Sequence, residues 1–151
     1  MKTSKGIALL DVSVLVPLFC EDHVHHEAAH AWFADNAAAG WASCPVTENG
    51  LFRILSNPAR IERHVPLPEL VGLLKRFCDH SHHHFWPDVL SFRDARSFNV
   101  PACHGHQQLT DVYLLALAVK QGGRLATFDQ RIPLAAVRGA TRAALEVIAP
   151  E

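Results

Sequence analysis

The chain has 151 residues, of which 49% are hydrophobic and 19% are charged, and its formal net charge is −1. This length and composition predict one folded domain over residues 1–151 and exclude an intrinsically disordered chain. A net charge near zero excludes capture of nucleic acid by a broadly basic surface, although it does not exclude a nuclease with a local site.

The sequence predicts neither a membrane anchor nor export. No run reaches the ~18 apolar residues of a spanning helix, and the apolar start of the chain contains an acid and lacks a small-residue cleavage site. The four cysteines form no C-x-x-C pair, which predicts reduced, mostly buried thiols without a disulfide framework. They are Cys20, Cys44, Cys78 and Cys103. We therefore expect a cytoplasmic protein.

Strand and helix patterns alternate along the chain. An apolar run over 7–10 is typical of a strand buried on both faces. The clearest helix begins near Thr110, a plausible cap, and stops at Gly122 and Gly123. After the first strand we expect, in order, a helix over 25–40, a strand over 41–44, helices over 46–57 and 66–80, a strand over 82–88, helices over 89–98 and 110–123, and strands over 124–129 and 144–150. This order predicts an α/β fold, a three-layer α/β/α sandwich with a mainly parallel sheet.

Four carboxylates can reach one edge of this sheet. Asp11 and Asp129 each end a predicted strand, and Glu48 and Asp111 lie in first turns of predicted helices. Ligands of open α/β sheets bind outside the carboxyl ends of the strands, where the strand order reverses, so we expect the four acids to line one crevice. Any single acid could instead be structural, because aspartate is common at such positions for capping reasons.

Four converging carboxylates repel one another unless a proton or a cation intervenes. Their oxygens suit hard cations such as Mg²⁺ or Mn²⁺. These ions can activate water and stabilise the attacking and leaving oxygens of a displacement at phosphorus. Metal-dependent hydrolysis of phosphodiester bonds is therefore the preferred chemistry.

Three strings carry a family resemblance: LLDVSVLVPLF, CPVTENGLFRILSNP and LTDVYLLALAVKQGGRLATFD. In this order and spacing, the sequence over residues 8–131 resembles a PIN-domain ribonuclease toxin of the VapC family, from type II toxin–antitoxin systems. The resemblance implies a PIN-like sandwich, an endoribonuclease that depends on Mg²⁺ or Mn²⁺, a homodimer, and neutralisation by a VapB-type antitoxin. The family's acidic quartet falls on Asp11, Glu48, Asp111 and Asp129.

Within this interpretation, Asp11 and Asp111 are the principal metal ligands. Glu48 and Asp129 are further ligands or orient the metal-bound water. Ser13 is a weaker candidate for positioning a ligand, since a serine there is also a common local cap. Arg53 either contacts RNA phosphate or forms a structural ion pair.

Two other functions compete with this one. The string HEAAH, with His26, Glu27 and His30, matches the H-E-x-x-H pattern of zinc metallopeptidases, although no third ligand follows it at a suitable spacing. A non-catalytic PIN-like binding module is the second alternative, against which a full set of mutually repelling acids argues. The histidines over 80–84 are expected to be solvated, and His104 and His106 are weak candidates for contact with substrate phosphate.

Overall fold

The computed structural model describes residues 6–59 and 64–150. Five strands form one sheet, all parallel, in the order β3-β2-β1-β4-β5. The strands are β1 (Ala8–Leu10), β2 (Trp41–Ser43), β3 (His83–Phe85), β4 (Arg124–Thr127) and β5 (Leu145–Val147). The predicted α/β fold with a parallel sheet is confirmed, and the order reverses between β1 and β4.

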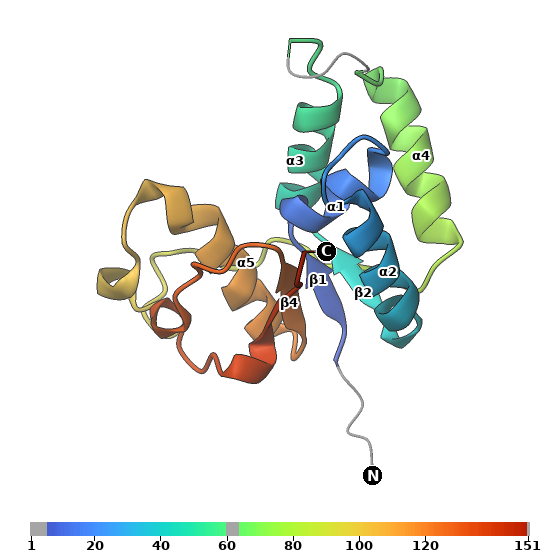
Figure 1. The fold of residues 1–151 in the computed structure, drawn as a ribbon. Coiled ribbons are helices and arrows are strands. Elements are labelled where there is room, and N and C mark those ends of the chain that lie inside the picture. The colour runs from blue at the N-terminus through green and yellow to red at the C-terminus, as the bar shows by residue number, and fades with distance from the viewer. Residues whose placement is uncertain (1–5, 60–63, 151) are drawn as a thin grey trace.

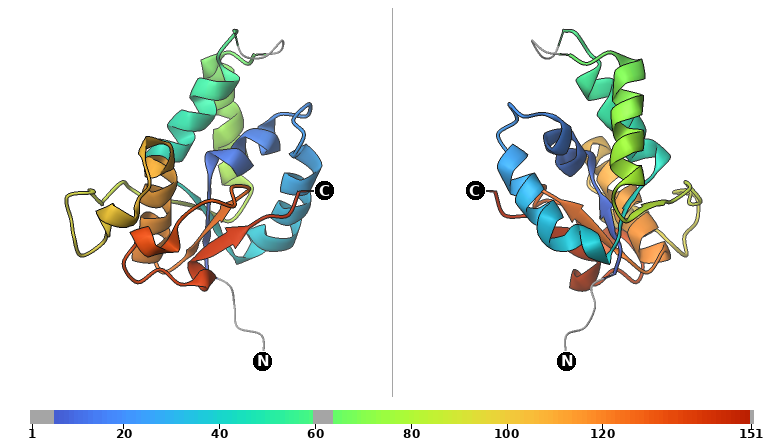
Figure 2. Two further views of the ribbon diagram at one scale, coloured as in Figure 1. Left: turned by 60° about the vertical axis from the view of Figure 1, so that its left-hand side comes forward. Right: turned by 90° about the vertical axis from the view of Figure 1, so that its right-hand side faces the viewer.

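Helices cover both faces of the sheet (Figures 1 and 2). They are α1 (Val12–Phe19), α2 (His26–Asn36), α3 (Pro45–Leu55), α4 (Leu67–Asp79) and α5 (Leu109–Lys120). The first four lie on one side of the sheet and α5 lies on the other, which gives the three layers. Short 3-10 turns occur at Ala37–Ala39, Val100–Ala102, His106–Gln108, Leu134–Ala136 and Arg142–Ala144.

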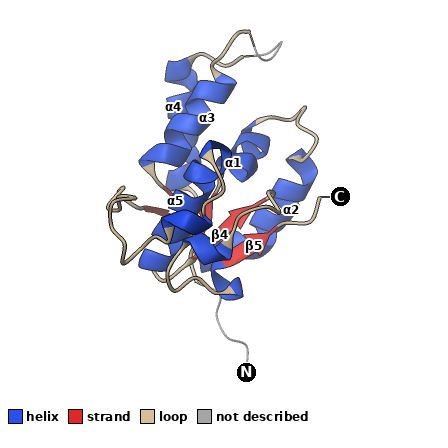
Figure 3. Ribbon diagram, turned by 90° about the vertical axis from the view of Figure 1, so that its left-hand side faces the viewer, coloured by secondary structure: helices blue, strands red, loops and turns tan. Residues whose placement is uncertain are grey.

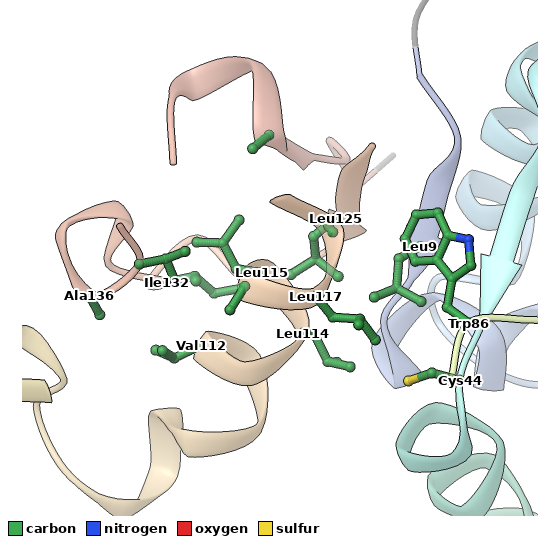
Figure 4. Packing of buried hydrophobic residues seen from close by; sticks show 14 of the residues in the cluster. Leu9, Cys44, Trp86, Val112, Leu114, Leu115, Leu117, Leu125, Ile132 and Ala136 are labelled. Atoms are coloured by element: carbon green, nitrogen blue, oxygen red, sulfur yellow. The ribbon is translucent and has the colours of Figure 1, made fainter. Parts of the chain in front are cut away.

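Successive residues of the central strands supply two separate cores. Leu9 and Leu125 pack against Leu114 and Leu117 of α5, as Figure 4 shows. Leu10 faces the opposite way, into the core shared with α1 to α4. Because both faces of β1 are covered, both kinds of position must be apolar, which explains its continuous apolar run.

Helix α1 was absent from the elements predicted from sequence. Its residues Val14 to Leu18 are all buried, between the sheet and the neighbouring helices. A helix buried on all sides has no polar face, so the amphipathic pattern that normally identifies a helix is missing. Pro17 inside the helix also weakens the helical signal.

The prediction of a helix over 89–98 is wrong. The chain there forms turns and one antiparallel bridge from Phe98 to Val137. The buried ring of Phe98 stacks on Phe92 with centroids 4.3 Å apart. Asp94 Oδ1 accepts a hydrogen bond from the Arg96 backbone N–H at 2.9 Å, a local bond that competes with helix formation.

Thr110 does not cap α5 as predicted, because the helix already begins at Leu109. A 3-10 turn runs directly into the helix, and its last residue, Gln108, occupies the cap position without a side-chain capping bond. The predicted stop is confirmed: the helix ends at Lys120, and Gly122 follows with a φ of 72°. Glycine adopts this left-handed conformation without strain.

The four cysteines are free, as predicted, but only Cys44 is buried and the other three are half-buried. Burial raises the pKa of the Cys44 thiol, and raises that of Cys78 to about 11. Both are therefore protonated, unreactive thiols at neutral pH. Within residues 6–59 and 64–150, no helix is both long enough and apolar enough to cross a membrane.

Candidate active site

The predicted acids lie around the point where the strand order reverses. Asp11 follows β1 and caps α1, and Asp129 follows β4, which pairs with β1. Asp111 lies in the first turn of α5, and Glu48 lies in the first turn of α3. Figure 3 shows that α3 and α5 flank the end of the sheet from which α1 departs.

Asp11 is buried and accepts three hydrogen bonds. Its Oδ1 accepts from the Val12 backbone N–H at 2.8 Å. Its Oδ2 accepts from Ser13 Oγ and Thr127 Oγ1, each at 2.8 Å. The carboxylate is therefore fixed in one orientation between β1, α1 and β4. A metal ligand and a purely structural aspartate would both be held in this way.

The same two hydroxyls hold the segment that carries Asp129. The Phe128 backbone N–H donates to Ser13 Oγ at 3.1 Å, and the Asp129 backbone N–H donates to Thr127 Oγ1 at 3.0 Å. Asp129 Oδ1 in turn accepts from the Arg131 backbone N–H at 2.9 Å. The positions of the two aspartates are thus coupled through two hydroxyl groups.

The pKa of Asp111 shows the effect of burial and of the neighbouring acids. Its pKa is raised from 3.8 to about 7, first because burial disfavours the charged form and then because Asp11 and Asp129 repel that charge. A hydrogen bond with the Asp129 side chain also favours the protonated form, and Arg131 only partly offsets these effects. Asp11, Asp111 and Asp129 are therefore one electrostatic cluster.

Glu48 is held in a different network. Its Oε2 accepts a hydrogen bond of 2.6 Å from Ser43 Oγ, which itself lies 2.7 Å from His83 Nε2. Because the serine proton goes to Glu48, His83 must donate from Nε2 to the serine oxygen. The charges that most raise the pKa of Asp111 are those of Asp11 and Asp129, whereas Glu48 raises the pKa of the Cys78 thiol of α4. The structure thus brings three of the four predicted acids together.

The chemistry of the three aspartates fits a hard cation. A cation between them would replace the proton that Asp111 holds and would relieve the repulsion, and all of their donors are carboxylate oxygens. In the described part of the chain, no three histidine, cysteine or acidic side chains are grouped closely enough to hold an ion as they stand. Binding of a cation would therefore require the side chains to move closer.

The H-E-x-x-H string has a structural explanation. The rings of His26 and His30 lie 4.4 Å apart on one face of α2. His26 Nδ1 lies 2.7 Å from the Pro17 carbonyl oxygen, and His30 Nε2 lies 2.9 Å from that of Leu18. A carbonyl oxygen can only accept, so both imidazoles donate to carbonyls in the last turn of α1, and that of Pro17 also accepts from the Cys20 backbone N–H. The zinc peptidase alternative is not favoured.

The other residues proposed from the sequence to contact RNA or a ligand lie in different surroundings. Ser13 lies within the cluster and donates to Asp11. Arg53 is exposed on α3 and forms no ion pair with another residue in 6–59 or 64–150. His104 and His106 are exposed in the segment before α5.

A cleft of about 540 Å³ opens beside the aspartates, lined by Ser13, His23, His25, Phe128, Asp129, Gln130 and Arg131. A smaller groove of about 280 Å³ lies between α1 and α3. Its lining is Val12, Ser13, Val16, Cys20, His23, Ile54 and Leu55. The two share Ser13 and His23, so they are continuous at the edge of the site.

Three residues of the networks were not predicted. They are Thr127, Ser43 and His83. Thr127 donates to Asp11, 116 positions away, and Ser43 donates to Glu48 five positions on. His83 contacts Ser43, 40 positions away, on the neighbouring strand. One signal was present in the sequence: Thr127 is a hydroxyl residue that follows the apolar pair Leu125 and Ala126 in its strand, two positions before an acid. A buried hydroxyl needs a hydrogen-bond partner, and that partner could have been sought at the neighbouring strand end.

A model of the PIN domain family matches residues 8–138. The chain belongs to the PIN-domain family. Ribonuclease VapC44 of Mycobacterium tuberculosis is 44% identical over 135 residues, which cover 89% of this chain and 94% of that protein. Ribonuclease VapC39 of the same organism is 38% identical, covering 87% and 95% of the two chains. Ribonuclease VapC38 is 39% identical, covering 82% and 85%. The predicted resemblance is confirmed, and within the PIN-domain family this chain groups with the VapC ribonucleases.

Proposed function

We propose that this PIN-domain protein is a metal-dependent endoribonuclease and the toxin of a VapBC-type toxin–antitoxin system. The observation that carries the proposal is the coupling of Asp111 to Asp11 and Asp129 at the reversal of strand order. Its relatives are named ribonucleases, and their similarity extends over nearly the whole chain. A crowded set of carboxylates at a ligand-binding edge suits cleavage of a phosphodiester bond.

The acidic quartet is proposed to hold Mg²⁺ or Mn²⁺. Asp11 and Asp111 are the principal ligands, and Glu48 and Asp129 are further ligands or orient the attacking water. Ser13 and Thr127 fix the Asp11 carboxylate by hydrogen bonds. When bound, the cation supplies a more acidic water and stabilises charge that develops on the phosphate oxygens.

In this proposal, Ser13, Arg53 and Arg131 bind and orient the RNA. Ser13 lies between the cleft and the groove, next to the aspartates. Arg53 and Arg131 are exposed cations that can meet the phosphate groups flanking the scissile bond. Arg53 forms no ion pair in the described part of the chain, and Arg131, which is paired with Asp129, only partly offsets the charge of the cluster.

We further propose that the protein acts in the cytoplasm as a homodimer of single PIN domains over residues 1–151, and that a VapB-type antitoxin neutralises it. The groove between α1 and α3 offers apolar side chains of Val16, Ile54 and Leu55 to an antitoxin segment. Because this groove shares Ser13 with the cleft, a bound segment would also obstruct the acidic site.

The test is incubation of the purified protein with a mixture of structured RNAs and Mg²⁺ or Mn²⁺, beside a sample with EDTA. Asp111→Asn is the inactive variant, and Asp35→Asn is the matched control, since Asp35 is exposed on α2. Discrete cleavage by the wild type and by Asp35→Asn, lost with EDTA and in Asp111→Asn, is expected. RNA binding without cleavage by the folded, metal-loaded protein would instead indicate the non-catalytic binding module.

A further inference from the structure

One wall of the 540 Å³ cleft has aromatic rings that the quartet does not use. The wall consists of His23, His25 and Phe128, and the cleft is also lined by Asp129 and Arg131. Phe128 directly precedes Asp129, so this wall begins one residue from a proposed metal ligand. A nucleotide next to the scissile phosphate would lie against it.

The rings form a stacked platform. The His25 ring lies parallel to that of Phe128, with centroids 4.5 Å apart and an interplanar angle of 12°. His23 leans on His25 at 5.6 Å and 41°. The His25 backbone N–H donates to His23 Nδ1 at 3.0 Å, so the proton of a neutral His23 ring is on Nε2. The platform is therefore aromatic, with a ring N–H beside it.

His25 has no evident structural role for its ring. It occupies the cap position of α2, yet its side chain makes no capping hydrogen bond. Both His25 and Phe128 are only half-buried, so the stack is not enclosed in the core. In contrast, His26 and His30 are engaged with the carbonyls at the end of α1. Among these four described histidines, the His25 ring alone forms no hydrogen bond, and it contacts the rings of Phe128 and His23.

A nucleobase fits this wall better than other ligands of an RNA-cleaving site. Unstacked bases of RNA are commonly held by aromatic rings, histidine included, and by arginine planes. The cleft volume lies within the range of small-molecule sites. The Arg131 side chain, 85% exposed despite its ion pair with Asp129, can reach a phosphate.

We propose that the stacked pair of His25 and Phe128 offers an aromatic surface against which a base of the RNA nucleotide that flanks the scissile phosphate packs, with Arg131 at the phosphate of that nucleotide. This inference rests on the proposed ribonuclease function and adds a substrate-positioning site to it. Stacking is tolerant of base identity, because every base has an aromatic face. The wall therefore sets where the strand lies, and it requires that the flanking nucleotide be unpaired.

The experiment uses an RNA that the wild type cleaves, with its cleavage site mapped. Single-stranded oligonucleotides spanning that site are prepared intact and with one abasic nucleotide at each flanking position. We measure kcat and KM for the wild type, His25→Ala, His25→Leu and His25→Phe. His80→Ala is the matched control, because His80 lies between the end of α4 and the start of the edge strand β3, whereas Phe128 follows the carboxyl end of β4.

In the wild type, an abasic nucleotide at one flanking position is expected to lower kcat/KM about tenfold. On intact RNA, His25→Ala and His25→Leu lose a similar factor, mainly through KM, and are insensitive to that abasic position. His25→Phe retains both the activity and the sensitivity, since it restores an aromatic ring. His80→Ala behaves as the wild type.

Two results would overturn the inference while leaving the ribonuclease function intact. One is cleavage by the wild type that no flanking abasic position weakens. The other is an equal loss by His25→Ala on intact and abasic RNA, which would indicate a structural role for the ring. If the wild type cleaves no RNA, the proposed ribonuclease function fails. The aromatic platform is then tested by binding alone, from the affinity of Asp111→Asn, with and without His25→Ala, for the intact and the abasic oligonucleotides. Equal affinities would exclude it.

Discussion

Thr127 Oγ1 donates a hydrogen bond of 2.8 Å to Asp11 Oδ2, and so joins the ends of β4 and β1. The same hydroxyl accepts from the Asp129 backbone N–H at 3.0 Å. One buried side chain thus fixes two of the proposed metal ligands. Its position between them makes Thr127 a positioning residue for the acidic cluster.

Replacement of Thr127 with valine is expected to weaken both fold and activity. Valine has nearly the same shape but leaves Asp11 with one donor fewer, at a cost of about 2 kcal/mol in the free energy of unfolding. Urea denaturation measures this loss, and cleavage should fall through kcat. Thr141→Val is the control, because Thr141 is exposed and makes no side-chain capping bond. Unchanged stability in Thr127→Val would show that the bond to Asp11 contributes nothing.

Asp11 and Asp111 are expected to respond oppositely to replacement by asparagine in metal-free protein. Both carboxylate oxygens of Asp11 accept hydrogen bonds, three in all. In Asp11→Asn, an amide N–H would replace one of these acceptors and point at a hydrogen-bond donor. Asp111 is instead a repelled charge. In EDTA at pH 8, urea denaturation should show Asp11→Asn less stable and Asp111→Asn more stable than the wild type. The same sign for both variants would contradict this assignment.

The raised pKa of Asp111 also predicts a dependence of stability on pH. The carboxyl titrates near 7 in the folded protein and near 3.8 when unfolded, so between these values the folded state binds more protons. The free energy of unfolding therefore falls as pH rises from about 4 to about 7, by at most about 4 kcal/mol from this group. Above pH 7 its destabilising effect is complete.

Comparison with Asp111→Asn isolates this contribution, because the two proteins differ only in this carboxyl group. Their difference in unfolding free energy, measured in EDTA at several pH values, should grow from pH 4 to pH 7 and then stay constant. A difference that is independent of pH would show that Asp111 is ionised throughout.

Added Mg²⁺ or Mn²⁺ is expected to raise the melting temperature of the wild type. An ion that binds only the folded state stabilises it by about 2.7 kcal/mol at a concentration one hundred times Kd. Asp111→Asn should respond much less, because a ligand is lost, and Asp35→Asn should respond as the wild type does. Sodium chloride at equal ionic strength controls for screening. An equal response in all three proteins would place the ion elsewhere.

Much of the site follows from local sequence because its parts lie at strand ends. The strand residues before Asp11 and Asp129 are buried in the sheet, and the acids follow the ends of the strands. Which acids meet is less predictable. Glu48 is bound to Ser43, whose other partner His83 is 40 positions away, and such pairings depend on strand order and register. No local periodicity encodes them.

The histidines show the opposite case, in which a local motif indicated the wrong role. His30→Ala should lower the free energy of unfolding by about 1 kcal/mol, because the Leu18 carbonyl loses its donor. His30→Gln keeps a donor and should recover part of that loss. Thermal melting with and without Zn²⁺ separates the two roles. A Zn²⁺-dependent rise in melting temperature that disappears in His30→Ala would restore the metal-binding interpretation.

The bond from Ser43 to Glu48 predicts a coupled effect on catalysis. Ser43 is buried, and its 2.6 Å bond is the contact that orients the Glu48 carboxylate on α3. If Glu48 must be oriented to act on the metal or its water, Ser43→Ala should lower kcat severalfold while leaving RNA affinity unchanged. Once Glu48 is already replaced by glutamine, the same change should have little further effect, because contacting residues are not additive. Four proteins, the wild type, the two single variants and the double variant, measure this coupling. Full additivity would mean that Ser43 acts on the fold through His83 and not through Glu48.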